Sequence, residues 1–326
     1  MGPQPERFDT PILVIFWRRP EVVLKLVAAL RFLKPQHLFL ACDGPREGNA
    51  EERIQVEEAR EQVEKSIDWD CRIEKRYSPK NQGCKYGPAN AIDWFFSNVE
   101  EGIILEDDCL PDPSFFWLCR ELLERYRHDT RVFQISGTNL IGDFPACQSS
   151  YFFSGYSVTW GWASWRRCWR AYDPEMKGWR EIHGSGILAN AFDSEVELGY
   201  WTRIWDCLVE FNYPVTWDYQ WNYTCFSNGA LSIVPRHNLV SNIGFGASAT
   251  NCFEEGNALA NLPTQALTSI SHPPLVLRER GYDQAVFRRM IESERNGPPG
   301  SLTSRLWLKF YFTMKGVSRK IQRTAP

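Results

Sequence analysis

The feature that most constrains the fold is an alternation of short apolar runs with amphipathic stretches in the first third of the chain. Pro11–Trp17 (PILVIFW) is a continuous apolar run rich in β-branched residues, which is typical of a strand buried on both faces of a parallel sheet. Apolar side chains then recur at helical spacing from Val22 to Leu33, and Pro20 suits the first turn of that helix. A strand followed by a helix is the repeating unit of α/β folds.

The same alternation continues to about residue 131. We predict further strands over 37–42, 71–77 and 102–105 and further helices over 47–65, 89–98 and 113–127, with a loop over 78–88. Asp112 and Pro113 provide the N-cap and the first turn of the last of these helices. The pattern therefore predicts an α/β fold with a mostly parallel, doubly wound sheet and helices on both faces.

From about Val132 the predicted strands become shorter and the loops longer. We predict helices over 162–172 and 195–211, strands over 214–217 and 231–234, and a linker over 294–304. The chain thus divides into residues 1–131, residues 132–293 and a terminal segment over 294–326.

Charge and apolar content exclude several classes of protein. Hydrophobic residues make up 43% of the 326 residues, enough for a full core, and 37 basic against 40 acidic residues argue against a nucleic-acid partner. No apolar run approaches the ~20 residues that span a membrane, and the first ten residues lack the apolar core of a signal peptide. The ten cysteines include no Cys-x-x-Cys pair, so we expect reduced thiols in a cytoplasmic protein.

Tryptophan is unusually frequent and unevenly placed. Nine of the 14 tryptophans fall between Trp160 and Trp221, in the second part of the chain. Large aromatic side chains contribute strongly to cores, and an indole is also a flat surface for stacking on a sugar ring. The sequence leaves both interpretations open.

Three consecutive carboxylates, Glu106, Asp107 and Asp108, directly follow the predicted strand over 102–105. The carboxyl ends of strands in open α/β sheets are where ligands bind. Like charges this close need a cation or hydrogen-bond donors to remain ionised, and carboxylate oxygens suit Mg²⁺ or Mn²⁺ held together with substrate phosphates. The alternative is a solvated acidic turn before the next helix.

Other polar residues follow the first two predicted strands. Asp43 ends the second strand, where an acid can accept hydrogen bonds from a ribose or a base, although Asp43-Gly44 is also a common turn. Arg19 follows the first strand and could meet a diphosphate at a helix start, or lie on the surface. Asp218 lies among aromatic residues in TWDYQW, where burial would raise the pKa of a general base; an N-cap is the alternative.

The last 26 residues, 301–326, combine six basic residues and no acid with apolar residues at helical spacing. Such a helix can lie on an anionic membrane surface, which would make the protein peripheral on the inner face of a membrane. A terminal helix packed on the domain is the alternative.

In their order along the chain, these segments resemble glycosyltransferases of the GT-A fold. The resemblance is to the N-acetylglucosaminyltransferase family that initiates complex N-glycan branching and to related bacterial sugar transferases, and it covers roughly residues 11–253. The segments that carry it are PILVIFWRRP, LFLACDG, GIILEDDCLPDPSFF, TWGWASW and TWDYQW.

The resemblance implies that residues 1–131 bind a nucleotide-sugar donor. By that likeness Asp108 binds the divalent metal, Mn²⁺ or Mg²⁺, Asp107 holds the ribose, and Glu106 contacts the donor sugar. Asp43 would recognise the base, most often uracil, and Arg19 would face the diphosphate.

The resemblance further implies that residues 132–293 bind a glycan or glycolipid acceptor. The turn of Trp160, Gly161 and Trp162 would border that acceptor, and Asp218 would deprotonate its hydroxyl. The chain departs from the family at two places, where Tyr219 replaces a second acid and Asn251 stands where close relatives carry a histidine.

These residues lead us to expect a metal-dependent glycosyltransferase. A single base opposite the leaving group implies direct displacement with inversion at the anomeric carbon, so that a UDP-α-sugar gives a β-linked product. The alternatives are a catalytically silent saccharide-binding protein and a metal-dependent phosphohydrolase or nucleotidyltransferase built on the same carboxylates.

Overall fold

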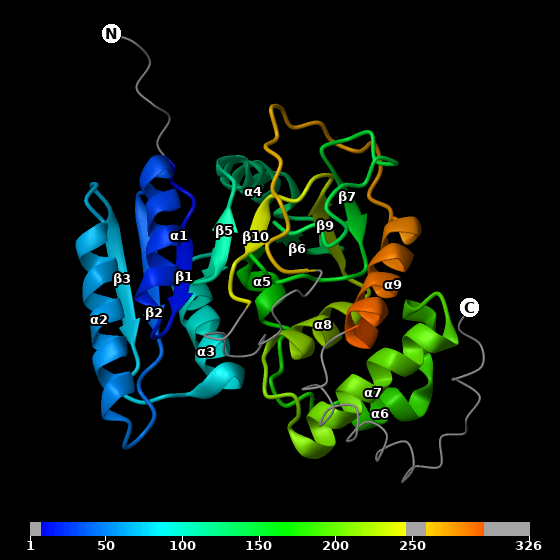
Figure 1. Cartoon of the computed structure of the whole chain (residues 1–326). Helices are drawn as coiled ribbons and strands as arrows, with labels where there is room; N and C mark the ends of the chain where they lie inside the picture. Colours follow the sequence, from blue (N-terminus) through cyan, green and yellow to red (C-terminus); the bar gives the residue numbers. More distant parts are fainter. Residues whose placement is uncertain (1–7, 246–258, 297–326) are drawn as a thin grey trace.

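Strand β1 (Ile12–Phe16) lies in the parallel part of the central sheet, as its apolar sequence predicts. It pairs in parallel with β2 (His37–Cys42) on one side and with β4 (Glu101–Glu106) on the other, and β3 (Arg72–Tyr77) forms the outer edge. The structure is a computed structural model that describes residues 8–245 and 259–296, with side chains described as far as residue 291. In Figure 1 strands β1, β2 and β3 lie on the left of the molecule with helices α1 and α2.

The second part of the chain continues the same sheet. Strand β8 (Trp162–Trp165) lies antiparallel between β4 and β6 (Val132–Ser136), and β9 (Leu231–Pro235) and β7 (Tyr151–Ser154) follow. Among the described residues the sheet has eight strands in the order β3-β2-β1-β4-β8-β6-β9-β7. Of their seven pairings, four are parallel and three antiparallel, which confirms the predicted α/β fold with a mostly parallel sheet.

A second, two-stranded sheet pairs β5 (Cys109–Pro111) with β10 (Val240–Asn242) in antiparallel register. β5 follows the acidic triplet directly, so this small sheet ties the end of β4 to a segment far along the chain. The division predicted at residue 131 does not interrupt the main sheet, because β4 from the first part pairs with β8 from the second.

The helices of the first part begin where local capping groups stand. Helix α1 (Pro20–Leu33) starts at its proline, and α4 (Pro113–Tyr126) is capped by Asp112, whose side chain accepts from the Ser114 backbone N–H at 2.8 Å. Helix α2 (Ala50–Ser66) starts later than predicted because Asn49 caps it, accepting from the Glu52 N–H at 3.0 Å.

Helix α3 (Gly83–Asn98) differs from the prediction, since it begins at Gly83 and not at Ala89. The Asp43 carboxylate accepts hydrogen bonds from the backbone N–H groups of Gln82, at 2.9 Å, and of Gly83, at 3.2 Å. These are the donors that a helix start leaves unsatisfied. A cap supplied from the end of another strand has no local sequence signal.

Two predictions in the second part are wrong. The predicted helix over 162–172 is strand β8 followed by the short helix α5 (Arg166–Trp169), because β8 lies between two strands with all four of its residues buried. Residues 214–217, predicted as a strand, form none and lead into helix α8 (Asp218–Ser227). Trp217 packs on Trp162, with ring centroids 5.9 Å apart.

The remaining helices gather around a second apolar core. They are α6 (Trp179–Ser185), the 3₁₀ helix η1 (Ile187–Ala191), α7 (Glu195–Phe211), which has the predicted bounds, and α9 (Arg280–Asn296). Helix α9 reaches into the predicted linker, and the rest of that linker and the tail over 301–326 lie outside the described residues.

The clustered tryptophans are mostly core residues. Of the nine between Trp160 and Trp221, only Trp160 is partly exposed, and the other eight are at most 4% exposed. Those eight are Trp162, Trp165, Trp169, Trp179, Trp201, Trp205, Trp217 and Trp221. Burial therefore accounts for most of the cluster. Of these nine tryptophans, only Trp160 has an exposed surface on which a ligand could stack.

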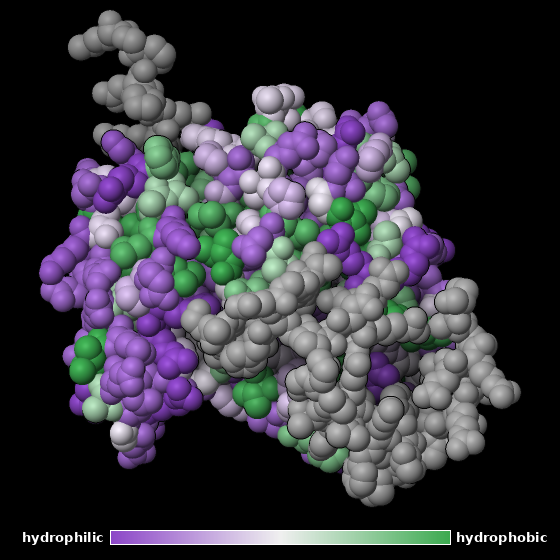
Figure 2. Space-filling model, viewed as in Figure 1, coloured by the Kyte–Doolittle hydropathy of each residue, from purple (hydrophilic) through white to green (hydrophobic). Residues whose placement is uncertain are grey.

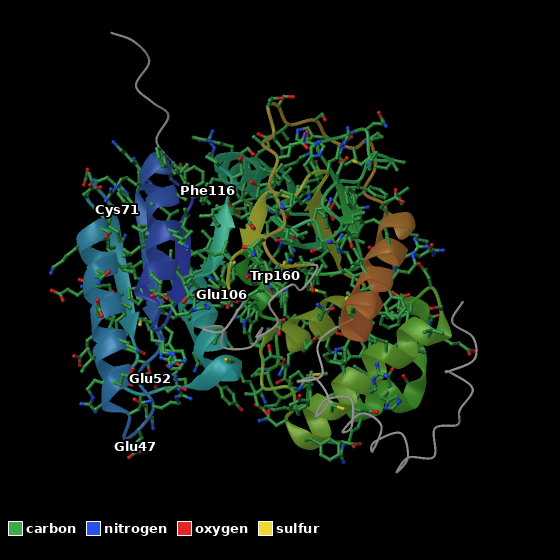
Figure 3. The ribbon with its side chains drawn as sticks, in the orientation of Figure 1. Glu47, Glu52, Cys71, Glu106, Phe116 and Trp160 are labelled. Atoms are coloured by element: carbon green, nitrogen blue, oxygen red, sulfur yellow. The ribbon has the colours of Figure 1, made fainter. Side chains whose placement is uncertain are left out.

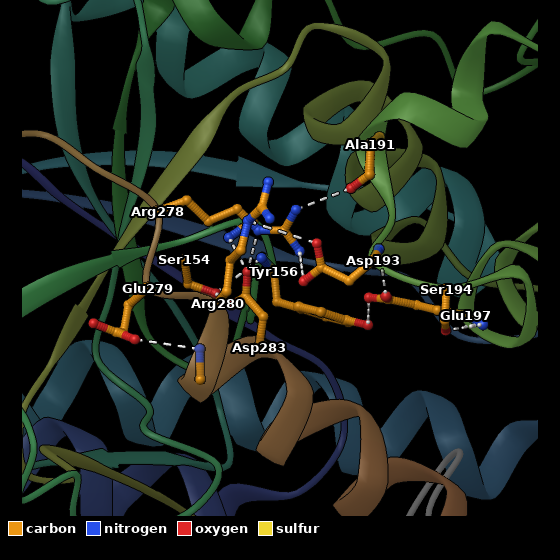
Figure 4. Close-up of polar contacts among 12 residues, drawn as sticks. Ser154, Tyr156, Ala191, Asp193, Ser194, Glu197, Arg278, Glu279, Arg280 and Asp283 are labelled. Atoms are coloured by element: carbon orange, nitrogen blue, oxygen red, sulfur yellow. Dashed lines mark hydrogen bonds and ion pairs between the residues drawn. The ribbon is translucent and has the colours of Figure 1, made fainter. Parts of the chain in front are cut away.

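Helix α9 is fixed to the sheet by buried polar contacts around Asp283, drawn in Figure 4. The Asp283 carboxylate accepts from Ser154 Oγ at 2.5 Å, from the Gly155 N–H at 3.0 Å and from Arg278 Nε at 2.5 Å. Arg278 also donates to the Ala191 carbonyl at 3.1 Å. These bonds join strand β7, helix α9 and the 3₁₀ helix.

Candidate active site

The acidic triplet lies at the carboxyl end of β4, beside the end of β1. The register pairs Ile15 with Glu106, so the residues that follow both strands meet at one edge of the sheet. Arg19 Nη2 lies 2.5 Å from Asp107 Oδ1 and 3.1 Å from Asp108 Oδ2. The structure thus brings together three residues that the sequence places at this edge, and Figure 3 labels Glu106 near the middle of the molecule.

The triplet is crowded with negative charge. Burial, and then the charges of Asp108, Asp218 and Asp107, raise the pKa of Glu106 to about 8. Burial and Asp108 also raise the pKa of Asp107 to about 6, against the opposing effect of Arg19. Burial acts to lower the pKa of Arg19, but the two aspartates outweigh it and raise that pKa. This edge of the sheet therefore has more carboxylates than its paired arginine neutralises.

Asp218 approaches the triplet from the start of helix α8. Its charge acts on Glu106, and the Trp217 side chain forms a hydrogen bond with Glu106. Thr216 Oγ1 donates to Asp218 Oδ1, and burial raises the pKa of Asp218 while that bond acts to lower it. Asp218 and Glu106 are thus neighbours, although they lie on segments far apart in the sequence.

The backbone of Gly244 fixes the position of Asp108. A Cβ atom at Gly244 would lie 2.0 Å from Asp108 Oδ2, and the Ile243 N–H donates to the Asp108 carbonyl at 2.9 Å. Glycine is therefore required where the chain leaves β10. Sequence reasoning missed both Gly244 and the contact of Trp217 with Glu106, although Gly244 is part of a glycine-containing stretch, IGFG, that could have drawn attention.

Asp43 is engaged in structural hydrogen bonds. Besides the N–H groups of Gln82 and Gly83, its carboxylate accepts from the Gly44 N–H at 2.8 Å and from Asn81 Nδ2 at 3.0 Å. A Cβ atom at Gly87 would lie 3.2 Å from its Oδ2. Asp43 therefore organises the loop before α3, next to the end of β2.

The Trp160–Trp162 turn lies beside the triplet, with its two indoles in different surroundings. Gly161 has φ of +67°, and a Cβ atom there would meet Val240 Cγ2 at 2.9 Å and Leu105 Cδ2 at 3.3 Å, so this turn packs against the end of β4. Trp160, labelled in Figure 3, is partly exposed and packs edge-on against Phe245. Trp162 is 0% exposed, so it supports the site from the core and offers no surface to a ligand.

The acidic set has the chemistry of a divalent-cation site. Within residues 8–245 and 259–296 there is no group of three or more His, Cys, Asp or Glu arranged as metal ligands. Mg²⁺ in nucleotide enzymes needs only one or two carboxylates together with substrate phosphates. Asp108, whose side chain is 20% exposed, and the excess of carboxylates around it fit that requirement.

Two histidines of the second part of the chain, His237 and His272, lie against other side chains. His237 Nδ1 lies 3.0 Å from Asp143 Oδ1, and His272 Nδ1 lies 2.9 Å from the Tyr151 hydroxyl. Asn251 is outside the described residues. None of the nine cysteines of the described part forms a disulfide, and no helix in that part is long and apolar enough to cross a bilayer.

The sequence matches no protein-family model and no curated protein. Among solved structures, the chain is similar to a UDP-glucose pyrophosphorylase complexed with UDP-glucose, at 8% identity and a TM-score of 0.31, over 50% of this chain and 79% of that one. It is also similar to a mannosyltransferase from Pyrobaculum calidifontis in complex with GDP-Man and Mn²⁺, at 12% identity and a TM-score of 0.31, over 51% of this chain and 49% of that one. At this level neither likeness identifies a family, an activity or a ligand, and the fold class rests on the sheet order itself.

Proposed function

We propose that the protein is a metal-dependent glycosyltransferase that moves a sugar from a nucleoside diphosphate donor to an acceptor hydroxyl. The observation that carries the proposal is the meeting of four carboxylates at one edge of the sheet. Glu106, Asp107 and Asp108 come from the end of β4, with Arg19 paired to the two aspartates, and Asp218 approaches from α8. The side of this group that contains Arg19 and Asp108 suits a diphosphate, and Asp218 supplies a separate carboxylate for the acceptor.

The donor side would bind a nucleotide sugar through residues of the first part of the chain. Asp108 would hold Mn²⁺ or Mg²⁺, which when bound stabilises the negative charge of a diphosphate. Arg19 would pair with the diphosphate, Asp107 would hold the ribose, and Glu106 would contact the donor sugar. Asp43 would act at the base through the loop that its carboxylate organises.

The acceptor side would use Asp218 as a general base. The Asp218 carboxylate takes the proton of the acceptor hydroxyl while the oxygen bonds to the anomeric carbon, and the bond from that carbon to the nucleoside diphosphate breaks. Attack from the face opposite the leaving group inverts the anomeric configuration. Thr216, which donates to Asp218 Oδ1, would orient the carboxylate.

The test is a thermal-shift panel of UDP, GDP, ADP and CMP, each with Mn²⁺ and with EDTA. A ligand at 100 times its dissociation constant stabilises the folded state by about 2.7 kcal/mol, which a melting curve detects. We expect one nucleoside diphosphate, UDP being the first candidate, to raise the melting temperature with Mn²⁺ and not with EDTA. No shift with any nucleotide would overturn the proposal in favour of a saccharide-binding protein.

The reaction product distinguishes a transferase from the other enzymes whose active sites could use such carboxylates. Incubation with the nucleotide sugar of the responding base should release the intact nucleoside diphosphate. Release of inorganic phosphate would identify a phosphohydrolase instead. Conversion of the nucleotide sugar and added diphosphate into nucleoside triphosphate and sugar 1-phosphate would identify a nucleotidyltransferase.

A further inference from the structure

A polar cavity of about 290 Å³ lies where the first turn of α3 meets the loop before α6 and the connection between α7 and α8. These elements are labelled in the lower part of Figure 1. The residues that supply its chemistry are Lys85, Tyr86, Glu175, Met176, Asn212 and Gln220. None of them belongs to the carboxylate group described above.

Two polar side chains of this cavity are buried, and one of them has an atom that is unpaired within the described part of the chain. Lys85 is 6% exposed, and its Nζ lies 3.1 Å from Glu175 Oε1 and 3.3 Å from Asn212 Oδ1. Gln220 is 1% exposed, and among the described residues its Oε1 atom has no hydrogen-bond partner. A buried acceptor without a donor is unfavourable, so a ligand that donates to Gln220 Oε1 would be stabilised here.

The charges and surfaces of the cavity indicate the class of that ligand. The Lys85 ammonium and the Glu175 carboxylate neutralise each other, so the cavity favours neither an anion nor a cation. Donors and acceptors alternate over short distances, which suits neighbouring hydroxyl groups that both donate and accept. The half-exposed Tyr86 ring, beside the buried Met176, adds an apolar surface for the face of a sugar ring.

The cavity lies beside the base of the proposed reaction. Gln220 follows Asp218 in the first turn of α8, and the Tyr172 hydroxyl donates to the Trp217 carbonyl at 3.1 Å. Burial raises the pKa of the Tyr172 phenol, and the charges of Asp218, Asp93, Asp173 and Glu175 add to that rise. On the other side, Lys85 follows Gly83, whose N–H binds Asp43.

We propose that this cavity binds one sugar unit of a neutral saccharide acceptor, whose hydroxyl groups bond to Lys85, Asn212 and Gln220. That the saccharide is an acceptor rests on the proposed transferase function, but the binding of a saccharide can be tested without that function.

The experiment is ligand-observed saturation-transfer NMR on the full chain with four methyl glycosides. The probes are methyl β-D-glucopyranoside, β-D-galactopyranoside, α-D-mannopyranoside and N-acetyl-β-D-glucosaminide, at up to about 10 mM because single sugars bind weakly. The variants are Lys85→Met and Gln220→Met, which keep the length of the side chain and remove its polar end, and Glu175→Gln. Lys65→Met is the matched control, since Lys65 is 72% exposed on α2.

We expect at least one glycoside to bind the wild-type protein and Lys65→Met, with affinity at least about tenfold weaker in Lys85→Met and Gln220→Met. Glu175 is 47% exposed, so Glu175→Gln should fold even if a buried substitution does not, and it should also weaken binding. Absence of binding to the wild-type protein, or unchanged binding in the folded variants, would overturn the assignment.

Nucleotide binding by the wild-type protein separates this inference from the proposed function. A nucleotide response without glycoside binding would remove the cavity assignment and leave the transferase proposal. Glycoside binding that Lys85→Met abolishes, without any nucleotide response, would keep the cavity as a saccharide site and remove the transferase.

Discussion

At the scale of single residues, the backbone of Gly244 leaves no room for a side chain beside Asp108. Because a Cβ atom at Gly244 would come within 2.0 Å of Asp108 Oδ2, Gly244→Ala must displace that carboxylate. We expect Mn²⁺-dependent nucleotide affinity to fall at least about tenfold, since a metal ligand out of place loses its bond. Thermal shift with titrated nucleotide measures the loss.

Gly199→Ala is the matched control for this substitution. Gly199 lies in helix α7, where an added Cβ would meet no atom within 4 Å, so alanine should stabilise the protein by up to about 1 kcal/mol without affecting nucleotide binding. Unchanged nucleotide affinity in Gly244→Ala would show that Asp108 is not a metal ligand.

Asp218 carries the other residue-scale prediction. Asp218→Asn keeps the shape of the side chain and removes the proton acceptor, so transfer from the nucleotide sugar should slow by at least ~10²-fold while nucleotide binding is retained. Asp68→Asn, at a side chain that is 59% exposed, should leave turnover unchanged. Ordinary turnover in Asp218→Asn would place the base elsewhere.

The sequence identified residue types better than it identified residue roles. The triplet and Arg19 meet as their positions after predicted strands led us to expect, whereas Asp218 begins helix α8 and approaches them from there. Asp43 caps a neighbouring loop, and Trp162 is buried, because strand ends and turns serve both ligands and packing. Only the contacts in three dimensions separate these uses.

At the scale of elements, helix α9 depends on one buried carboxylate. Asp283→Ala would remove the partner of Arg278 Nε and leave two further donors unpaired, so the free energy of unfolding should fall by about 3 kcal/mol. Urea unfolding measures the change. Asp68→Ala, at an exposed ion pair, should change it by no more than about 0.5 kcal/mol, and an equal effect of the two substitutions would show that the bonds to Asp283 add nothing.

Glu52 joins the loops after β1 and β2, and its ionisation makes that junction sensitive to pH. Desolvation acts to raise the pKa of Glu52, but hydrogen bonds from Arg46 and the charges of Arg46 and Arg18 outweigh it and lower that pKa below 4.5. The carboxylate therefore stabilises the fold above about pH 4.5, the value of the unfolded chain, and this stabilisation is lost as the pH falls through the lowered pKa.

Measurement of the free energy of unfolding between about pH 6 and about pH 3 tests the direction of this pH dependence. The free energy of unfolding of the wild-type protein should fall more steeply with acid than that of Glu52→Gln, which has no carboxylate to protonate. Parallel curves would show that the arginines do not stabilise the charged form.

Figure 2 shows a mostly hydrophilic surface over α2, whose first turn holds Glu52.

The ends of a helix were predictable where the residue that caps it lies in the same segment of the chain. Helices α4 and α7 have the predicted extents because Asp112 and Ser194 cap them from within the same segment. Helix α3 begins earlier than predicted, because its cap comes from Asp43. Strand β8 was predicted as a helix, and its pairing on both sides with β4 and β6 outweighs its local preference.

At the scale of the whole molecule, one sheet runs through both parts of the chain. The insertion of β8 beside β4 means that neither part has a complete core without the other, so the described domain should unfold in one transition. Tryptophan fluorescence reports mainly on residues 160–221, which hold nine of the 14 tryptophans, whereas far-UV circular dichroism reports on the whole chain. The two curves should coincide in urea, and a separate second transition in circular dichroism would show that the two parts unfold independently.

The sequence by itself determined the α/β class, the parallel first part of the sheet and the acidic edge at the end of β4. These follow from apolar periodicity and from polar residues directly after strands, which are local properties of the chain. The tertiary structure alone decided that Asp218 lies near Glu106, that Gly244 packs against Asp108, and that Lys85, Glu175 and Gln220 line one cavity. Each of these contacts joins segments far apart in the chain, where no local spacing encodes which side chains will meet.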